Sequence, residues 1–348
     1  MQHIANPDRR TGTVLRAAAG LVAAGIALSL PAIASAQTQD EIYEAAKKEG
    51  KVVFWSVLDK DPMSVITAGF QKAFPGIEVE HFEIQPGPAA QRMIAEAQAG
   101  QVNLDVVHSD IPYLEPSLDR DLLEPYDWSK SGIDPQVVAY DGRCITLMNL
   151  GLPIIVNTSM VQPDDIKGWD DLLDPKWKGK IAVEARGKGL AILLQEWGEE
   201  KTGQFVDGLK ANGALIVKGS TPTMEAVAGG QVAIALGSYI GKVIDYQEKG
   251  APVDWARVGP LPVEDQFVCM TKKAPHPNAG RLFGMWLTTR EGQDALWQTQ
   301  HFGHIVGPVL DPSGEEVKAK GIAVVNSDPE PAESQKRQAW VAKRIAGL

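Results

Sequence analysis

The chain alternates between short apolar runs and longer amphipathic runs from residue 39 onward. Residues 39–49 have helical spacing that ends at Gly50, and KVVFWS at 51–56 is apolar enough for a strand buried on both faces. A helix follows from Asp61-Pro62. Then come a strand at 77–83, a helix at 87–100 and a strand at 104–110. This order predicts a parallel sheet with helices on both faces.

The same alternation starts again in the middle of the chain. Strands are predicted at 178–185, 212–219 and 231–238, and helices at 189–204, 221–230 and 239–252. Residues 144–157 are too long and too apolar for one ordinary strand, so we interpret them as a crossing between two lobes. A second crossing is expected near 258–270, followed by two helices within 276–298 that pack back on the first lobe. The tail from about Glu315 is expected to return to the second lobe.

These patterns predict an α/β protein of two lobes with a ligand cleft between them. Lobe 1 comprises residues 37–150, with 263–312 returning to it, and lobe 2 comprises 151–262, with 313–348 returning to it. The chain of 348 residues exceeds what one hydrophobic core usually organises, which favours two domains.

The first 36 residues have the pattern of a secretory signal peptide. Arg9, Arg10 and Arg16 precede an apolar stretch, and Ala34, Ser35 and Ala36 form a small-residue cleavage site. Pro31 and the many glycines and alanines argue against a membrane anchor, which needs about 18 uninterrupted apolar residues. No cysteine lies at the cleavage site to carry a lipid, so we expect export through the Sec route to the periplasm.

The chain is acidic, with a formal net charge of −10. The leader carries three positive charges and one negative charge, which leaves −12 for the remainder. Nucleic acids and anionic membranes bind basic patches, so neither is an expected partner. The two cysteines, Cys144 and Cys269, have an oxidising compartment in which to pair, but we favour two buried apolar thiols.

Open α/β sheets bind ligands at the carboxyl ends of their strands, so the polar residues just after the predicted strands are the candidate site. They are Ser56, Asp59, Ser109, Asp110, Arg186, Ser220, Thr221, Ser238 and Tyr239.

Several runs resemble the periplasmic solute-binding proteins of bacterial ABC importers. The most distinctive are WDDLLDPKWKGKIAV at 169–183 and APHPNAGRLFGMWLTTREGQDAL at 274–296, supported by KVVFWS, IIVNT, EAVAGGQVAIAL and KGAPVDW. The branch in question includes binders of ferric iron, thiamine and 2-aminoethylphosphonate. The resemblance implies a type II periplasmic-binding-protein fold. It also implies a monomer that closes on its solute and docks on an inner-membrane permease.

Ferric iron is one of two solutes that we weigh. Iron binders of this branch carry two adjacent tyrosines after the strand predicted here at 231–238, whereas this chain has Ser238-Tyr239-Ile240. The loop after KVVFWS reads VLDKD and lacks the histidine that often serves there. Tyr239 with Asp59, Asp110 or Glu184 and a bound anion keeps iron as the alternative.

A small organic or phosphorus-containing anion fits the candidate residues better. A guanidinium such as Arg186 grips a carboxylate or phosphonate with two parallel hydrogen bonds, and backbone N–H groups at helix starts favour negative charge. Two other interpretations stay open: Arg186 pairs with Glu184, and Ser220 or Thr221 caps a helix. Tyr239 is predicted to close over the ligand, and Asp110 either pairs an amine of the solute or starts a helix.

We predict a receptor rather than an enzyme, with no cofactor and no resident metal. The chain lacks the sequence motifs of phosphate loops, nucleophile elbows and zinc proteases. A hydrolase built on Ser238 with a distant histidine and aspartate remains a less favoured alternative. His301 and His304 stand three residues apart, but Gly303 suggests a loop rather than a zinc-binding helix face.

Overall fold

The computed structural model describes residues 36–347, which belong to one unit. All but the last residue of the predicted signal peptide therefore lie outside the described residues. Among the described helices, none has the length and apolar character needed to cross a membrane.

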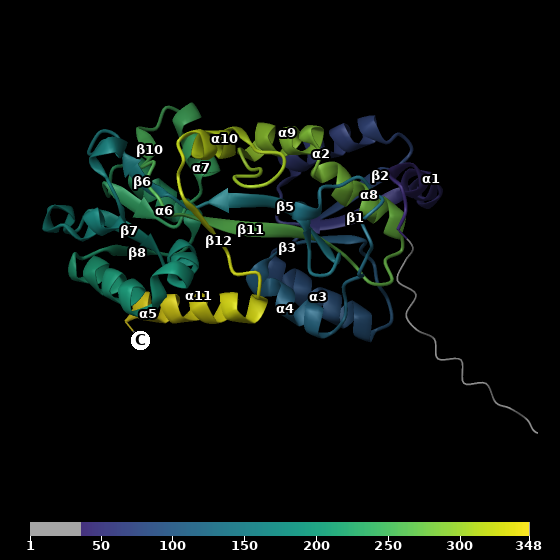
Figure 1. Ribbon diagram of the computed structural model, residues 1–348, viewed down its shortest axis with the longest axis horizontal. Helices are drawn as coiled ribbons and strands as arrows, with labels where there is room; N and C mark the ends of the chain where they lie inside the picture. Colours follow the sequence, from purple (N-terminus) through teal and green to yellow (C-terminus); the bar gives the residue numbers. More distant parts are fainter. Residues whose placement is uncertain (1–35, 348) are drawn as a thin grey trace, which may run out of the picture. The chain divides into compact units, whose positions relative to one another are not determined.

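A seven-stranded sheet combines five strands from the first half of the chain with two that come after residue 260 (Figure 1). Its strand order is β2-β1-β3-β11-β5-β4, and β12 pairs with β11. β1 is parallel to its neighbours β2 and β3, whereas β11 is antiparallel to both β3 and β5. The strands are β1 (Lys51–Ser56), β2 (Glu78–Glu83), β3 (Val106–Asp110), β4 (Val138–Ala139), β5 (Cys144–Gly151), β11 (Leu261–Met270) and β12 (Val324–Asn326).

Helices cover both faces of this sheet because successive strand residues point to opposite sides. Phe54 of β1 packs with Phe70 and Phe283 on one face, while Trp55 packs with Leu114 on the other. The five predicted helices of the first lobe are confirmed, and α4 (Ile111–Asp119), which had no predicted range, follows β3. The predicted helices are α1 (Gln39–Glu49), α2 (Lys60–Ala73), α3 (Pro86–Gln98), α8 (Pro277–Leu287) and α9 (Arg290–Gln300).

A second sheet of five strands has the order β10-β6-β9-β7-β8. The strands are β6 (Ile154–Asn157), β7 (Ile181–Glu184), β8 (Leu215–Val217), β9 (Ile234–Leu236) and β10 (Val253–Trp255). The helices are α5 (Lys188–Ala211), α6 (Ser220–Ala228) and α7 (Ile240–Glu248). α5 is longer than predicted and is interrupted at Gly198, whose φ of 72° is not helical.

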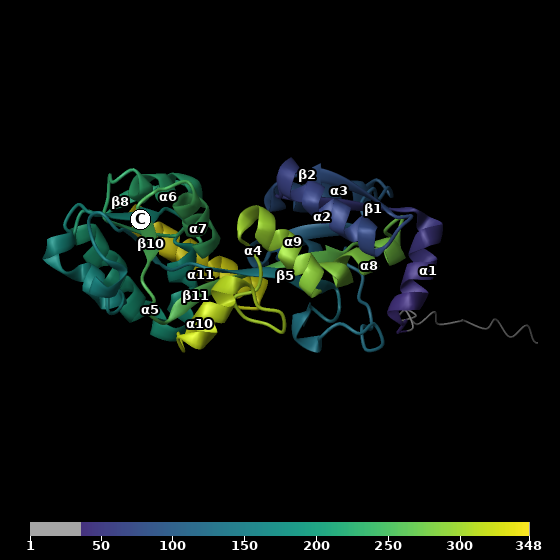
Figure 2. The ribbon, with the colours of Figure 1, turned by 90° about the horizontal axis from the view of Figure 1, so that it is seen from above.

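The chain crosses between the sheets where the apolar pattern predicted it. β5 lies in the first sheet and β6 in the second, with only residues 152–153 between them. The chain returns from β10 to β11 through residues 256–260, and β11 and β5 then run side by side (Figure 2).

The C-terminal tail differs from the expected return to the second lobe. α10 (Pro312–Ala319) buries Val317 among second-lobe residues, but β12 pairs with β11 of the first sheet. α11 (Pro331–Ala346) packs against both α5 and α4, as Figure 1 shows. The tail therefore contacts both sheets, and the lobe boundaries stay a proposal.

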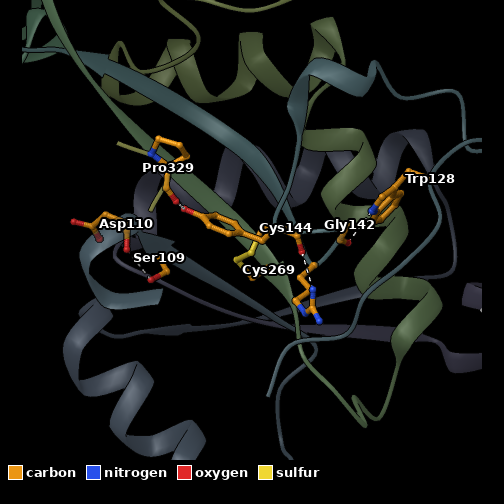
Figure 3. The surroundings of a disulfide bond; sticks show 9 residues. Ser109, Asp110, Trp128, Gly142, Cys144, Cys269 and Pro329 are labelled. Carbon is orange, nitrogen blue, oxygen red and sulfur yellow. Dashed lines mark hydrogen bonds between the residues drawn. A yellow bond between two sulfur atoms is a disulfide. The ribbon is translucent and has the colours of Figure 1, made fainter. Parts of the chain in front are cut away.

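Cys144 and Cys269 form a disulfide, which corrects our preference for two free thiols (Figure 3). They are register partners on the antiparallel strands β5 and β11, with Cα atoms 4.0 Å apart. Their separation of 125 residues in sequence carried no information about this distance, because strand pairing alone decides which residues face each other.

Candidate functional site

Two turns that follow strands of the second sheet require glycine, and they position side chains of the candidate site. Gly187 has a φ of 61° and precedes α5, and Gly237 has a φ of 99° and precedes Ser238. A Cβ on Gly237 would lie 2.4 Å from the Cβ of Glu184, and one on Gly187 would lie 2.5 Å from Val341. Both turns are therefore tight, and they bring the starts of α5 and α7 to the ends of β7 and β9.

A buried cluster of charged groups joins the two sheets at these strand ends. The Nζ of Lys188, the first residue of α5, lies 2.5 Å from Oε1 of Glu264 and 3.3 Å from Oδ2 of Asp110. The hydroxyl of Tyr239 donates a 2.8 Å hydrogen bond to Oε2 of Glu264 and lies 3.5 Å from the same Nζ. We call Asp110, Lys188, Tyr239 and Glu264 the central cluster.

Electrostatics keeps the lysine of this cluster charged and the tyrosine neutral. Burial by itself lowers the pKa of Lys188, but Glu264, Tyr239 and Asp110 outweigh it and raise that pKa well above its usual value. Burial raises the pKa of Tyr239, and the charge of Glu264 raises it further. The cluster therefore carries two carboxylates, one ammonium and a protonated phenol.

A second group, the cationic patch, lies on the second sheet and comprises Arg186, Ser220, Thr221 and Lys242. Lys242 donates a 3.2 Å hydrogen bond to Ser220 Oγ and another to Thr221 Oγ1. Burial lowers the pKa of Lys242; Asp245 and Glu225 oppose this, and the positive charge of Arg186 adds to the lowering. Within residues 36–347, no carboxylate lies within ion-pair distance of Lys242, so the patch has an excess of positive charge.

Arg186 pairs with Glu184, as one of the open interpretations expected. Its Nε lies 2.8 Å from Oε1 of Glu184, which is buried and also accepts bonds from the backbone N–H groups of Arg186 and Gly219. About half of the Arg186 side chain remains exposed. The guanidinium therefore still presents its terminal nitrogens to solvent.

Ser220 and Thr221 do not cap α6. The N-cap is Gly219, and the two hydroxyls lie in the first turn, where they accept hydrogen bonds from Lys242. The helix-cap interpretation is therefore wrong. A role of the two hydroxyls in ligand binding stays a prediction, and both are hydrogen-bonded to the cation Lys242.

The remaining predicted residues lie outside these two groups. Ser56 is bonded to His81 at 2.8 Å, and Asp59 is the exposed N-cap of α2, a helix predicted to start after Asp61. Ser109 Oγ donates to the carbonyl oxygen of Asp110, as Figure 3 shows. Ser238 is fully buried, and its Oγ has no hydrogen-bond partner in the part of the chain that the structure describes.

Sequence reasoning missed Lys188, Lys242 and Glu264. Lys188 stands two residues after Arg186, directly before the helix predicted at 189–204. Glu264 and Asp265 interrupt an otherwise apolar run that forms the long strand β11, and charges inside a buried strand were an available signal. Lys242 carried no signal beyond its place in the first turn of α7.

The two candidate zinc ligands point to different partners. His301 lies 2.6 Å from Asp245, whereas buried His304 bonds the carbonyl of Thr146 and burial lowers its pKa to about 4. Over residues 36–347, no group of three or more His, Cys, Asp or Glu side chains is arranged to hold a metal ion.

The family of the chain follows from comparison with known proteins. Residues 66–323 match the model of the bacterial extracellular solute-binding proteins, and the chain belongs to this family.

Two curated relatives carry names that mention iron. "Iron uptake protein A1" of Synechocystis is 28% identical over 116 residues, which are 31% of this chain and 32% of that protein. The "Fe(3+)-binding periplasmic protein" of Serratia marcescens is 22% identical over 277 residues, which are 76% of this chain and 81% of that protein. The chain thus spans about a third of the first relative and most of the second.

Solved structures share the fold. Iron-bound HitA of Pseudomonas aeruginosa superposes with a TM-score of 0.66 at 20% identity, covering 84% of this chain and 99% of HitA. A substrate-binding protein of an Agrobacterium tumefaciens ABC transporter gives a TM-score of 0.68 at 17% identity, covering 85% and 93%. At these identities the likeness shows the fold alone, which is the predicted type II periplasmic-binding-protein fold.

The protein is therefore a bacterial extracellular solute-binding protein. The predictions of a solute-binding protein and of a location outside the cytoplasm are confirmed by this family, whereas the identity of the solute is a separate question.

Proposed function

We propose that this protein captures a small organic or phosphorus-containing anion and delivers it unchanged to an ABC permease. One observation carries the proposal: Arg186 and Lys242 place two positive charges beside the hydroxyls of Ser220 and Thr221, on an accessible surface.

The donors of the cationic patch suit an anion. A lysine ammonium has only protons to give, so Ser220 and Thr221 accept from Lys242 and keep their own hydroxyl protons free to donate. Arg186 donates a hydrogen bond through Nε to the Glu184 carboxylate. Its two terminal nitrogens therefore remain for parallel hydrogen bonds to a carboxylate or phosphonate. An anion would also relieve the repulsion between Arg186 and Lys242.

Access to the central cluster requires the two sheets to separate, whereas the cationic patch is accessible as the structure stands. The cavity lined by Lys188, Glu264, Asp265 and Ser327 has a volume of about 20 Å³, which is room for about one water molecule. A solute reaches the central cluster only when the Lys188–Asp110 contact between the sheets opens. A solute that contacts both lobes binds the closed arrangement more tightly than the open one, and this difference in affinity favours closure.

Ferric iron is the second candidate, favoured by the names of the relatives. Asp110, Glu264 and Tyr239 supply oxygen atoms of the kind that a hard trivalent cation prefers. Against iron, the Lys188 ammonium already lies among these oxygens, and Tyr239 holds its proton with a raised pKa. Only one phenol follows β9.

A hydrolase is less well supported. A serine nucleophile needs a base within hydrogen-bond distance, and Ser238 Oγ has no partner among the described residues. We therefore propose a receptor that does not alter its solute.

Native mass spectrometry of protein purified from its own periplasm tests the proposal. We expect a bound small anion that dissociates with its mass unchanged, followed by calorimetric titration of the identified compound. A bound ferric ion, or a visible charge-transfer band on adding ferric salt, would instead establish the second candidate.

A further inference from the structure

We infer that Lys188 is a specificity-determining residue whose ammonium fills the cation position of the central cluster and so excludes metal ions and solutes with an ammonium group. The inference rests on the proposed function where it narrows the solute to an anion without a cationic group.

The cation position is built by three separate elements. Oδ2 of Asp110 comes from the end of β3, Oε1 of Glu264 from β11, and the hydroxyl of Tyr239 from the start of α7. All three lie between 2.5 and 3.5 Å from the Lys188 Nζ. This arrangement of oxygens from both sheets is one that a hard cation or an ammonium group would use.

Because the central cluster is buried, its two carboxylates require a positive charge at the cation position. The side chains of Lys188 and Asp110 are 10% exposed, and that of Glu264 is 7% exposed. Two carboxylates so poorly solvated are costly without a positive partner. Lys188 supplies that charge from within the chain, and the bond from Tyr239 satisfies the second oxygen of Glu264.

An external cation would therefore have to displace Lys188. The lysine is tethered at the first residue of α5, just after the tight turn at Gly187, so it competes at a high effective concentration. Asp110 is then not free to pair an amine of the solute. The anion is held instead by the cationic patch, where Lys242 has no ion-pair partner among residues 36–347 and Arg186 is paired only through its Nε.

Terbium(III) is a suitable probe, because it prefers oxygen ligands and its luminescence is sensitised by a nearby phenol. We expect the intact protein to bind it weakly. Lys188→Ala should bind terbium at least about tenfold more tightly, since two uncompensated carboxylates then need a cation. Terbium should also raise the melting temperature of Lys188→Ala and not that of the intact protein.

Two matched variants complete the experiment. Lys51→Ala removes a lysine from an exposed pair with Glu80 and should leave terbium affinity unchanged. Lys188→Ala/Glu264→Gln removes one carboxylate as well and should lose most of the gained affinity. If Lys188→Ala does not fold, even with terbium, the titration is made on Lys188→Gln, which keeps the side-chain length and one donor.

The inference is overturned if the folded Lys188 variant binds terbium no better than the intact protein, or if Lys51→Ala gains as much. A second arm compares methylphosphonate with aminomethylphosphonate. The intact protein should prefer the former, and the Lys188 variant should lose that preference. If neither phosphonate binds but the terbium gain is present, the proposed anion function fails while the role of Lys188 stands.

Discussion

The phenol of Tyr239 donates a 2.8 Å hydrogen bond to Glu264, which joins the start of α7 to the strand β11 of the other sheet. Both residues are buried, so the lost bond cannot be replaced by water without rearrangement. Tyr239→Phe should lower the free energy of unfolding by about 1–3 kcal/mol. Urea unfolding followed by tryptophan fluorescence measures this loss.

Tyr113 provides the control for this change. It is 39% exposed, and Tyr113→Phe should leave the urea midpoint unaltered. Equal effects of the two substitutions would show that the Tyr239–Glu264 bond contributes nothing specific.

Arg186→Ala should weaken binding of the anionic solute by about 2 kcal/mol, or roughly 30-fold in Kd, because a charged partner of the anion is removed. Arg186→Lys should give an intermediate affinity, since it keeps the charge but not the two parallel bonds. Calorimetry on folded protein measures both. The matched control is Arg257→Ala, which removes an arginine paired with Asp254 and Glu316. If the two alanine variants bind equally well, Arg186 does not contact the solute.

Reduction of the Cys144–Cys269 disulfide should destabilise the protein, because the bond joins strands whose residues are 125 apart in sequence. A loss of about 2–4 kcal/mol is expected for a disulfide that closes a long loop. Urea unfolding with and without reductant measures it, and Cys144→Ala/Cys269→Ala should be insensitive to reductant. Quantitative alkylation of both thiols in unreduced protein from the periplasm would contradict the bond.

Stability should fall as the pH rises from about 4 to about 7, in part because of Asp265. Burial raises the pKa of this carboxyl from 3.8 to about 7, although the bond from Ser327 opposes the rise. A carboxyl whose pKa is higher in the folded state favours folding at low pH, and this contribution is lost as the pH passes through the folded-state pKa.

Asp265→Asn removes this dependence, because an amide does not ionise. The variant should be more stable than the intact protein at pH 8, by on the order of 2 kcal/mol, and should show a shallower decline from pH 4 to pH 8. Urea unfolding across this range measures it. Burial also raises the pKa of Asp311 to about 6, so part of the decline should remain. Identical pH profiles would show that Asp265 ionises freely in the folded protein.

The order of strands and helices followed from the sequence because each apolar period is local. The strand at 51–56 and the helix at 39–49 could be predicted from their own residues, without knowledge of what they pack against. The two crossings were also predictable, since an apolar run as long as 144–157 cannot stay in one sheet. Arg186 and Tyr239 were predicted as site residues because the carboxyl ends of strands gather at one edge, and this role stays a prediction.

The partners of these residues were decided only by the tertiary structure. Lys188 meets Asp110 and Glu264 across 78 and 76 residues of chain, and Cys144 meets Cys269 across 125. Pairing of this kind depends on strand register and on how two sheets approach, neither of which has a local period. Local patterns along the chain were enough to predict the elements, the class of fold and the strand ends that carry polar groups. Which of those groups are buried, paired and charged was decided by packing, because the energy of a charge depends on its surroundings and not on its neighbours in the chain.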